Sequence, residues 1–90
     1  MKPIQIEVFA SPGCNRCGQA LDLVDKITRE IGTERFAWRK VDVLDELDYA
    51  VELGVLSMPA IVINGELVFR RRPTADILRD ELKSRLQDLP

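Results

Sequence analysis

The 90-residue sequence predicts one α/β domain over residues 1–90, with a four-stranded mixed sheet flanked by three helices in the order β-α-β-α-β-β-α. Three observations lead to this prediction. The chain is short for two domains, yet 46% of its residues are hydrophobic, which suffices for a single core. Segments with alternating apolar residues are interleaved with segments in which apolar residues recur every three or four positions. Asn64-Gly65 separates two β-rich runs, which is typical of a hairpin.

The first half of the chain predicts a β-α-β unit. Residues 4–10 alternate apolar and polar side chains as a strand does, and the Ser-Pro-Gly sequence at 11–13 ends that strand. A helix is expected over residues 15–31, because apolar residues recur there with helical spacing and Gly32 occupies the position of a left-handed C-cap. Residues 36–43 are rich in aromatic and β-branched residues and predict the second strand. The crossover makes the two strands parallel.

The second half predicts a short helix, a hairpin and a last helix. The short helix is expected over residues 45–53. Residues 60–63 and 67–69 form the two hairpin strands on either side of the Asn-Gly turn. Residues 73–74, Pro-Thr, open the last helix, whose expected apolar stripe is Ile77, Leu78, Leu82, Leu86 and Leu89.

Strand directions predict which segments meet at one end of the sheet. If the third strand pairs antiparallel with the first, Pro59 at its start lies beside Cys14, which follows the end of the first strand. The hairpin then makes the fourth strand run in the same direction as the first. Its C-terminal end, Arg70, Arg71 and Arg72, is therefore expected on the same rim.

The composition excludes several classes of function. Thirteen Lys and Arg residues against fifteen Asp and Glu residues give a net charge of −2, which argues against a nucleic-acid partner. No segment approaches the run of about 18 apolar residues that a transmembrane helix requires, so no membrane association is expected. Residues 1–7 contain no apolar signal-peptide core, and the expected location is the cytoplasm.

The chain contains two cysteines, Cys14 and Cys17, and no histidine. Catalytic triads and dyads that need histidine are therefore excluded, as are histidine-ligated metal sites. A zinc ion needs four ligands, and two thiolates do not supply them, so we expect no metal. What remains is chemistry between two sulfur atoms, without a cofactor.

The two cysteines lie at the predicted junction of the first strand and the first helix. Their spacing places the sulfurs on neighbouring positions of one helix face, close enough to form a disulfide. The N–H groups and partial positive charge at a helix N-terminus favour a thiolate, and Arg16 adds to this effect. Cys14 precedes the helix body, so we expect it to be exposed and to act as the nucleophile. Cys17 lies on the apolar stripe and is expected to be the covered, resolving thiol.

A rim of further residues is expected to surround and modulate the dithiol. It comprises Pro12, Gly13, Asn15, Arg16, Arg70, Arg71 and Arg72. The three consecutive arginines have a second interpretation, a solvated strand end without function.

Over essentially its whole length the chain resembles the thioredoxin superfamily. The motif Cys14-Asn15-Arg16-Cys17 and the segment Val55–Ala60 carry the resemblance. It implies a minimal thioredoxin fold without the extra N-terminal strand and helix, and a cis peptide bond before Pro59. It also implies that the backbone of Met58 pairs with an extended substrate chain. The implied activity is thiol-disulfide oxidoreduction by a monomer. A disulfide-containing protein is the implied substrate, and a reductase or glutathione the electron donor.

Two departures from the superfamily patterns concern the subfamily. Thioredoxins carry a buried aspartate six residues before the first cysteine, where this chain has Val8. Glutaredoxins place two glycines after the last strand and a lysine shortly before the cysteines, where this chain has arginines and Ser11-Pro12-Gly13. A glutathione-coupled glutaredoxin stays as an alternative, and so does a metal or iron-sulfur carrier that uses the same cysteines as ligands.

Overall fold

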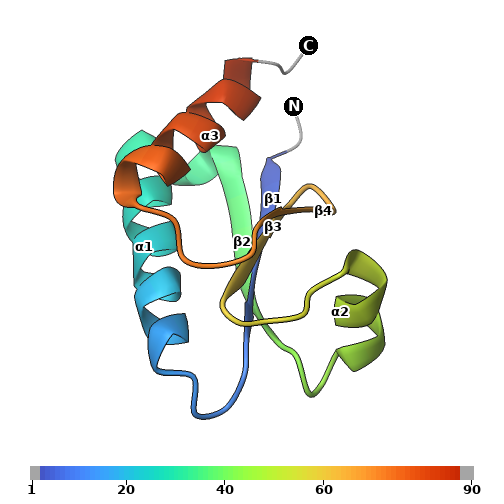
Figure 1. The fold of residues 1–90 in the computed structure, drawn as a ribbon. Helices are drawn as coiled ribbons and strands as arrows, with labels where there is room; N and C mark the ends of the chain where they lie inside the picture. The colour runs from blue at the N-terminus through green and yellow to red at the C-terminus, as the bar shows by residue number, and fades with distance from the viewer. Residues whose placement is uncertain (1–2, 88–90) are drawn as a thin grey trace.

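The computed structural model describes residues 3–87 and shows a sheet with helices on both faces (Figure 1). The elements in chain order are β1 (Ile4–Ala10), α1 (Asn15–Ile31), β2 (Phe36–Asp42), α2 (Leu47–Leu53), β3 (Ala60–Ile63), β4 (Glu66–Phe69) and α3 (Ala75–Gln87). The predicted fold class and element order are confirmed. Within the described residues, no helix is both long enough and apolar enough to cross a membrane.

The sheet has the strand order β2-β1-β3-β4. β1 pairs in parallel with β2, beginning with Ile4 opposite Phe36, and antiparallel with β3, where Phe9 lies opposite Ala60. β3 pairs antiparallel with β4, so β4 runs in the same direction as β1. These are the predicted directions. They bring the end of β1, the start of β3 and the end of β4 to one end of the sheet.

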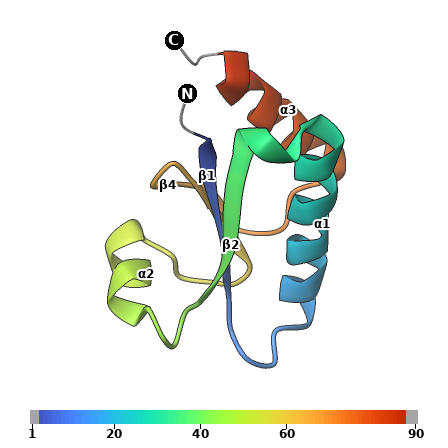
Figure 2. The ribbon, with the colours of Figure 1, turned by 180° about the vertical axis from the view of Figure 1, so that it is seen from behind.

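Two hydrophobic cores lie on the two faces of the sheet, one under α1 and α3 and one under α2 (Figures 1 and 2). β1 contributes to both, because the consecutive residues Val8 and Phe9 point to opposite faces. The first core consists of Ile4, Ile6, Val8, Ala20, Val24, Ile27, Phe36, Ile61, Ile63, Leu78 and Leu82. The second consists of Phe9, Val41, Val43, Ala50, Val55, Ala60 and Val62. All of β3 is buried, as expected for a strand covered on both faces.

The hairpin turns at Asn64 and Gly65, as predicted. Both residues have positive φ angles, 51° and 80°, which a type I′ turn requires. Asn64 also contacts β1: its side-chain oxygen accepts the N–H of Gln5 at 2.9 Å, and its own N–H donates to the Gln5 carbonyl at 2.8 Å. The turn therefore also satisfies backbone groups of β1 beyond the last β1–β3 pair.

α1 occupies the predicted residues, but the prediction of a left-handed C-cap at Gly32 is wrong. Gly32 has φ 146° and ψ 113°, a positive-φ conformation outside the left-handed helical region. Its N–H donates to the Thr28 carbonyl at 2.9 Å, and a short 3-10 turn at Thr33–Arg35 follows at once. Because β2 begins directly after this turn, the chain must reverse within a few residues. Glycine permits the conformation since it has no Cβ.

The short helix begins at Leu47, and the predicted start at Asp45 is wrong. The Asp42 carboxylate accepts the N–H of Leu44 at 2.9 Å, and the Asp42 carbonyl accepts the N–H groups of Asp45 and Glu46, each at 3.1 Å. An aspartate side chain that binds the backbone in this way offers it an alternative to the helix. The segment is therefore a turn that delays the helix.

The predicted apolar stripe of α3 is correct for its centre and wrong for Ile77. Leu78 and Leu82 are buried and Leu86 packs against the same core, whereas Ile77 is 53% exposed. Adjacent residues are separated by about 100° around a helix, so Ile77 is turned away from the face that Leu78 buries. Leu89 lies outside the described residues.

Candidate active site

The two cysteines are joined by a disulfide where β1 leads into α1. Cys14 is the N-cap residue of α1 and Cys17 lies in its first turn, with a Cα–Cα distance of 5.5 Å. The Cys17 N–H donates to the Cys14 carbonyl at 3.4 Å. The spacing of three residues at a helix start thus brings the sulfurs together, as the sequence predicts.

A tight turn delivers Cys14 from β1. The Cys14 N–H donates to the Ser11 carbonyl at 3.2 Å, with Pro12 and Gly13 between them. Gly13 has a φ of 79°, as the third residue of a type II turn requires. Pro12 is the second residue of the turn, where proline is common. The geometry of the turn therefore accounts for proline and glycine at positions 12 and 13. They end β1 and set the position of the first sulfur.

The two cysteines differ in exposure. Cys17 is 4% exposed, whereas Cys14 is partly exposed. No side chain caps the N-terminus of α1, and its first turn contains no acidic residue. The helix dipole at this end of α1 therefore favours negative charge on a nearby sulfur, without competition from a carboxylate in the first turn. This arrangement favours a thiolate at Cys14 in the reduced protein.

Pro59 lies at the start of β3, beside the turn that carries the cysteines. The Met58–Pro59 peptide bond is cis, as the resemblance implies. Pro59 is buried and Met58 is partly exposed. Across residues 3–87, the hydrogen bonds outside regular elements include none from the backbone of Met58. This backbone is therefore free to pair with an extended chain.

A cavity of about 440 Å³ adjoins the cysteine motif and the Met58–Pro59 segment. Its lining residues are Arg16, Gln19, Ser57, Met58, Pro59, Arg70, Arg71 and Arg72. The Ser57 hydroxyl donates to the Arg70 carbonyl at 3.3 Å and so connects the loop before β3 with the end of β4. Gln19 and Ser57 were not singled out from the sequence. Their only signal was proximity, since Gln19 is three residues from Arg16 on the helix and Ser57 is two residues from Pro59.

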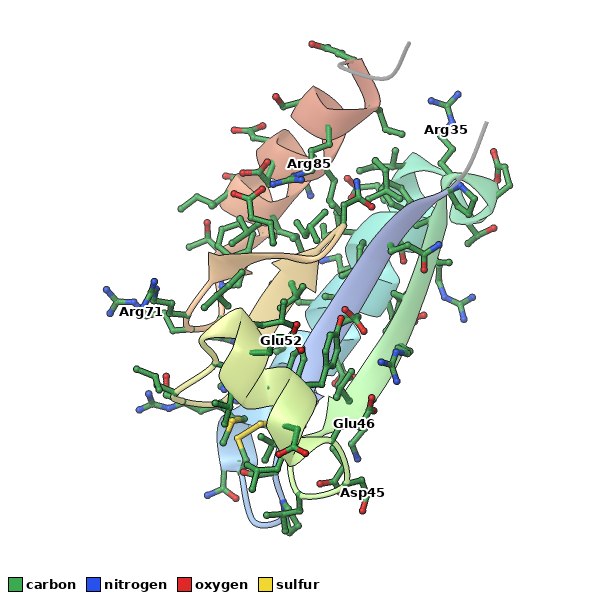
Figure 3. All side chains as sticks on the ribbon, turned by 90° about the vertical axis from the view of Figure 1, so that its right-hand side faces the viewer. Arg35, Asp45, Glu46, Glu52, Arg71 and Arg85 are labelled. Carbon is green, nitrogen blue, oxygen red and sulfur yellow. A yellow bond between two sulfur atoms is a disulfide. The ribbon has the colours of Figure 1, made fainter. Side chains whose placement is uncertain are left out.

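The disulfide lies between a basic and an acidic side of this end of the molecule. Figure 3 shows the sulfurs between Arg71 on one side and Asp45 and Glu46 on the other. Arg71 and Asp45 are both exposed. The sequence placed the arginines on this rim but gave no reason to expect acidic groups opposite them.

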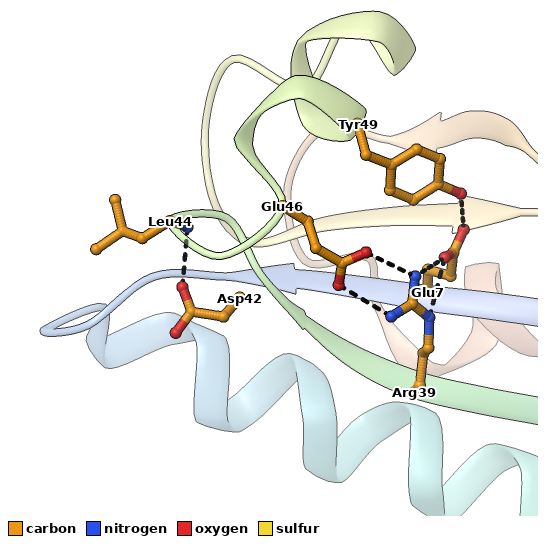
Figure 4. Close-up of polar contacts among 6 residues, drawn as sticks. All are labelled: Glu7, Arg39, Asp42, Leu44, Glu46 and Tyr49. Carbon is orange, nitrogen blue, oxygen red and sulfur yellow. Dashed lines mark hydrogen bonds and ion pairs between the residues drawn. The ribbon is translucent and has the colours of Figure 1, made fainter.

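A polar network on the α2 face of the sheet was also missed from the sequence (Figure 4). The Arg39 guanidinium donates to Glu7 at 2.8 Å and to Glu46 at 3.0 Å. The Tyr49 hydroxyl donates to the other Glu7 oxygen at 2.5 Å, and this hydrogen bond raises the pKa of Tyr49 to about 12. The network fastens α2 to β1 and β2.

The network does not supply a carboxylate in place of the aspartate that thioredoxins carry six residues before the first cysteine. Val8 occupies that position and is fully buried in the core under α1 and α3. Glu7 is adjacent in sequence, but successive residues of a strand point to opposite faces, and Glu7 contacts α2. Within residues 3–87, no group of three or more potential ligands is arranged to hold a metal ion.

In this structure the two cysteines at a helix start face a cis-proline at the start of a central strand. This combination defines the class of thioredoxin-fold thiol-disulfide oxidoreductases. A family model described as thioredoxin domain matches residues 4–82. The chain belongs to this thioredoxin family and is a thiol-disulfide oxidoreductase.

Relatives and solved structures agree with this assignment. The chain is 33% identical over 86 residues to a thioredoxin of Methanocaldococcus jannaschii, covering 96% of this chain and 100% of the relative. It is 32% identical over 84 residues to a probable thioredoxin of Methanothermobacter thermautotrophicus, covering 93% and 98%. A mutant thioredoxin from Halobacterium salinarum superimposes with a TM-score of 0.80 at 22% identity, covering 99% of this chain and 80% of that one. These matches support neither a glutaredoxin nor a metal carrier.

Proposed function

We propose that the protein reduces disulfide bonds in other proteins through Cys14 and Cys17, and that a dithiol reductase returns it to the reduced state. The observation that carries this proposal is the unequal exposure of Cys14 and Cys17, which are joined by a disulfide at the start of α1. The first turn of this helix contains no acidic residue that would oppose a thiolate. The partly exposed Cys14 is suited to attack a substrate, and the buried Cys17 is suited to act only on its neighbour.

The first step is attack by the Cys14 thiolate on one sulfur of the substrate disulfide. The substrate S–S bond breaks, a bond between Cys14 and that substrate sulfur forms, and the second substrate sulfur leaves as a thiolate. The leaving thiolate takes a proton from water. The N–H groups at the start of α1 assist this step because they stabilise the attacking thiolate.

The second step releases the substrate. The Cys17 thiolate attacks the Cys14 sulfur, the Cys14–Cys17 disulfide forms, and the remaining substrate thiolate departs and is protonated. The substrate has then gained two electrons and two protons, and the protein is in the disulfide form that the structure shows. Since Val8 replaces the aspartate of other thioredoxins, the Cys17 proton passes to solvent or to the leaving substrate rather than to a fixed carboxylate.

Substrate binding is assigned to the Met58–Pro59 segment and the surrounding rim. The substrate extends along Met58, whose backbone offers it a donor and an acceptor, while Pro59 keeps the loop close to the sulfurs. Pro12, Gly13 and Asn15 form the other border of the contact, and all three are exposed. The direction of the bound chain is then fixed, because backbone pairing is directional.

The test of the mechanism uses Cys17→Ser and, as its matched control, Cys14→Ser. With a disulfide-linked peptide, Cys17→Ser is expected to accumulate a covalent adduct through Cys14, because the resolving thiol is missing. Cys14→Ser is expected to form no adduct and to lose about a thousandfold or more in turnover. Mass spectrometry of the adduct and its thiol-sensitive cleavage provide the measurement. An adduct through Cys17 in the Cys14→Ser protein would contradict the assigned roles.

The electron donor is assigned to a dithiol reductase working in the cytoplasm, where thiols are kept reduced. Recycling of the oxidised protein is expected to be fast with such a reductase and slow with glutathione. Re-reduction rates with the two donors provide the comparison, and faster recycling by glutathione would contradict the assignment. We assign the active form to a monomer, which sedimentation of the reduced protein tests.

A further inference from the structure

We propose that the arginine surface, defined as Arg16, Arg70, Arg71 and Arg72, binds an acidic segment next to the reactive cysteine of the substrate protein. This inference rests on the proposed disulfide-reductase function and names the class of substrate. The protein then prefers substrates with carboxylates on one particular side of the reactive cysteine.

The arginine surface is assembled by the fold from two distant parts of the chain. Arg16 comes from the first turn of α1, and the other three follow β4, yet all four line the same cavity of about 440 Å³. That cavity also reaches Met58 and Pro59, where the substrate backbone is expected to pair. A chain segment held at the dithiol is therefore in position to place a side chain in this cavity.

The four guanidinium groups have no ion-pair partner among residues 3–87. Within the described residues, ion pairs involve the arginines at 29, 39, 79 and 85, and none involves the arginine surface. No carboxylate is among the residues that line the cavity, and all four arginines are exposed. Positive charge is therefore concentrated here in a protein whose net charge is −2. Guanidinium groups bind carboxylates with paired, parallel hydrogen bonds, which makes an acidic ligand the best match.

The extent of the surface favours a peptide segment over a small anion. Arg70, Arg71 and Arg72 also line a neighbouring cavity of about 610 Å³, which continues past Thr74 to Ile77. An extended chain advances about 3.3 Å per residue, so two adjoining cavities accommodate several residues. A segment with more than one carboxylate uses both cavities.

The opposite side of the dithiol repels the same segment. Asp45 and Glu52, which Figure 3 labels, are exposed, and Asp48 on α2 is exposed as well. Since the bound chain has a fixed direction, carboxylates on one side of its cysteine meet arginines, and carboxylates on the other side meet acidic groups. The charge pattern therefore selects both the sign of the segment and its position relative to the cysteine.

The test uses two peptides of identical composition and net charge. Each has a single cysteine in a disulfide with a small neutral thiol. One peptide carries glutamates before the cysteine and glutamines after it, and the other has the reverse order. A third peptide with glutamines on both sides is the neutral reference. The reduced protein is mixed with each peptide in a single turnover, and thiol release is followed at low and high ionic strength.

The wild-type protein is expected to reduce one acidic isomer about tenfold faster than the other at low ionic strength. The ratio should shrink as salt screens the charges over about 8 to 10 Å. The combined variant Arg70→Gln, Arg71→Gln and Arg72→Gln should bring the ratio close to one. Because the ratio compares two peptides on one protein, it is insensitive to any change in the basal rate.

The matched control removes three positive charges elsewhere through Lys26→Gln, Arg35→Gln and Lys83→Gln. All three residues are exposed, and Arg35 lies at the end of the sheet opposite the disulfide (Figure 3). This control should keep the wild-type ratio. Equal rates for the two isomers in the wild type would overturn the inference, as would a ratio that persists in the arginine variant.

Three further outcomes separate the acidic preference from the proposed reductase function on which it rests. If the neutral peptide is reduced while the two isomers react equally, the reductase function stands and the acidic preference fails. If none of the peptides is reduced, the proposed function itself fails. If the arginine variant loses rate with oxidised glutathione while the peptide isomers react equally, the cavity serves a free tripeptide, and the inference is wrong.

Discussion

Arg39 and Arg71 are both exposed arginines close to the sheet, but their surroundings differ. Arg39 lies on β2 and donates hydrogen bonds to the carboxylates of Glu7 and Glu46, on β1 and at the start of α2. Arg71 follows β4, lines the cavity beside the dithiol and takes part in none of the ion pairs of the described residues. One arginine holds elements of this chain together, while the other is available to a partner.

The same division applies to the rest of the molecule. Arg79 connects α3 to α1 through Glu30, and Arg85 connects α3 to β4 through Glu66. Arg39, Arg79 and Arg85 therefore lie between elements, where their removal affects packing, whereas Arg29 pairs with Asp25 within α1. The arginine surface lies where β1, β3 and β4 present their ends to solvent, and we expect its removal to affect binding. Loss of an arginine should therefore lower the stability of the fold where the arginine is paired between elements, and should lower substrate binding at the arginine surface. The variants below test this difference in order of decreasing effect on stability.

Arg39→Met should lower the free energy of unfolding by about 2 kcal/mol, because it leaves the Glu7 carboxylate half-buried beside an apolar side chain. The Glu7 side chain is only 13% exposed, which makes the loss larger than for a surface pair. Urea unfolding gives the measurement, and turnover of a disulfide peptide should stay at the wild-type value. Arg35→Met, at an exposed position without an ion pair, is the matched control. A loss below about 0.5 kcal/mol would show that the network does not stabilise the fold.

Tyr49→Phe should lower the free energy of unfolding by about 1 to 1.5 kcal/mol at neutral pH, because it removes a hydrogen bond to a charged acceptor. The pKa of Tyr49 is raised to about 12, so the folded state holds this proton more tightly than the unfolded state, whose value is about 10. The contribution is therefore complete below about pH 10 and is lost as the pH rises toward 12.

The measurement for Tyr49 is the difference in unfolding free energy between wild type and Tyr49→Phe at several pH values. Other groups titrate in the same range, and the difference between the two proteins removes their contribution. The two unfolding curves should converge between about pH 10 and pH 12. A difference that does not change with pH would contradict the hydrogen bond to Glu7 as the cause.

Arg85→Gln should lower the free energy of unfolding by about 0.5 kcal/mol. The Arg85 side chain is 21% exposed, but its partner on β4, Glu66, is 68% exposed and its partner on α3, Glu81, is 32% exposed, so solvent screens much of the attraction. The effect should decrease further as salt is added. Urea unfolding at low and high ionic strength gives the measurement, and a loss as large as that for Arg39→Met would remove the distinction between shielded and exposed pairs.

The combined change of Arg70, Arg71 and Arg72 to glutamine should alter the free energy of unfolding by less than about 0.5 kcal/mol, because no partner in the described chain loses a contact. A small gain in stability would also fit, since neighbouring positive charges repel one another. Thermal or urea unfolding provides the measurement. A loss above 1 kcal/mol would mean that these arginines have a structural role, contrary to the comparison.

Much of the fold could be predicted from short stretches of sequence, because local rules determined it. The alternation along residues 4–10, the helical spacing along 15–31 and the Asn64-Gly65 turn each depend on neighbouring residues only. The spacing of Cys14 and Cys17 at a strand-helix junction likewise fixed the disulfide and its place at a helix start. The crossover predicted parallel β1 and β2 and the hairpin predicted antiparallel β3 and β4, whereas the antiparallel pairing of β1 with β3, which brings distant segments to one rim, was a condition that the structure met.

The tertiary structure alone decided which side chains meet across that framework. Glu7 reads from the sequence as the polar side of a strand, and only the position of α2 gives it Tyr49 as a partner. Ile77 fits an apolar stripe, but the rotation of α3 on the sheet leaves it exposed. The acidic side of the rim opposite Arg71 is another example (Figure 3). Local periodicity fixes the type of an element, whereas its rotation and neighbours depend on packing between residues far apart in the chain.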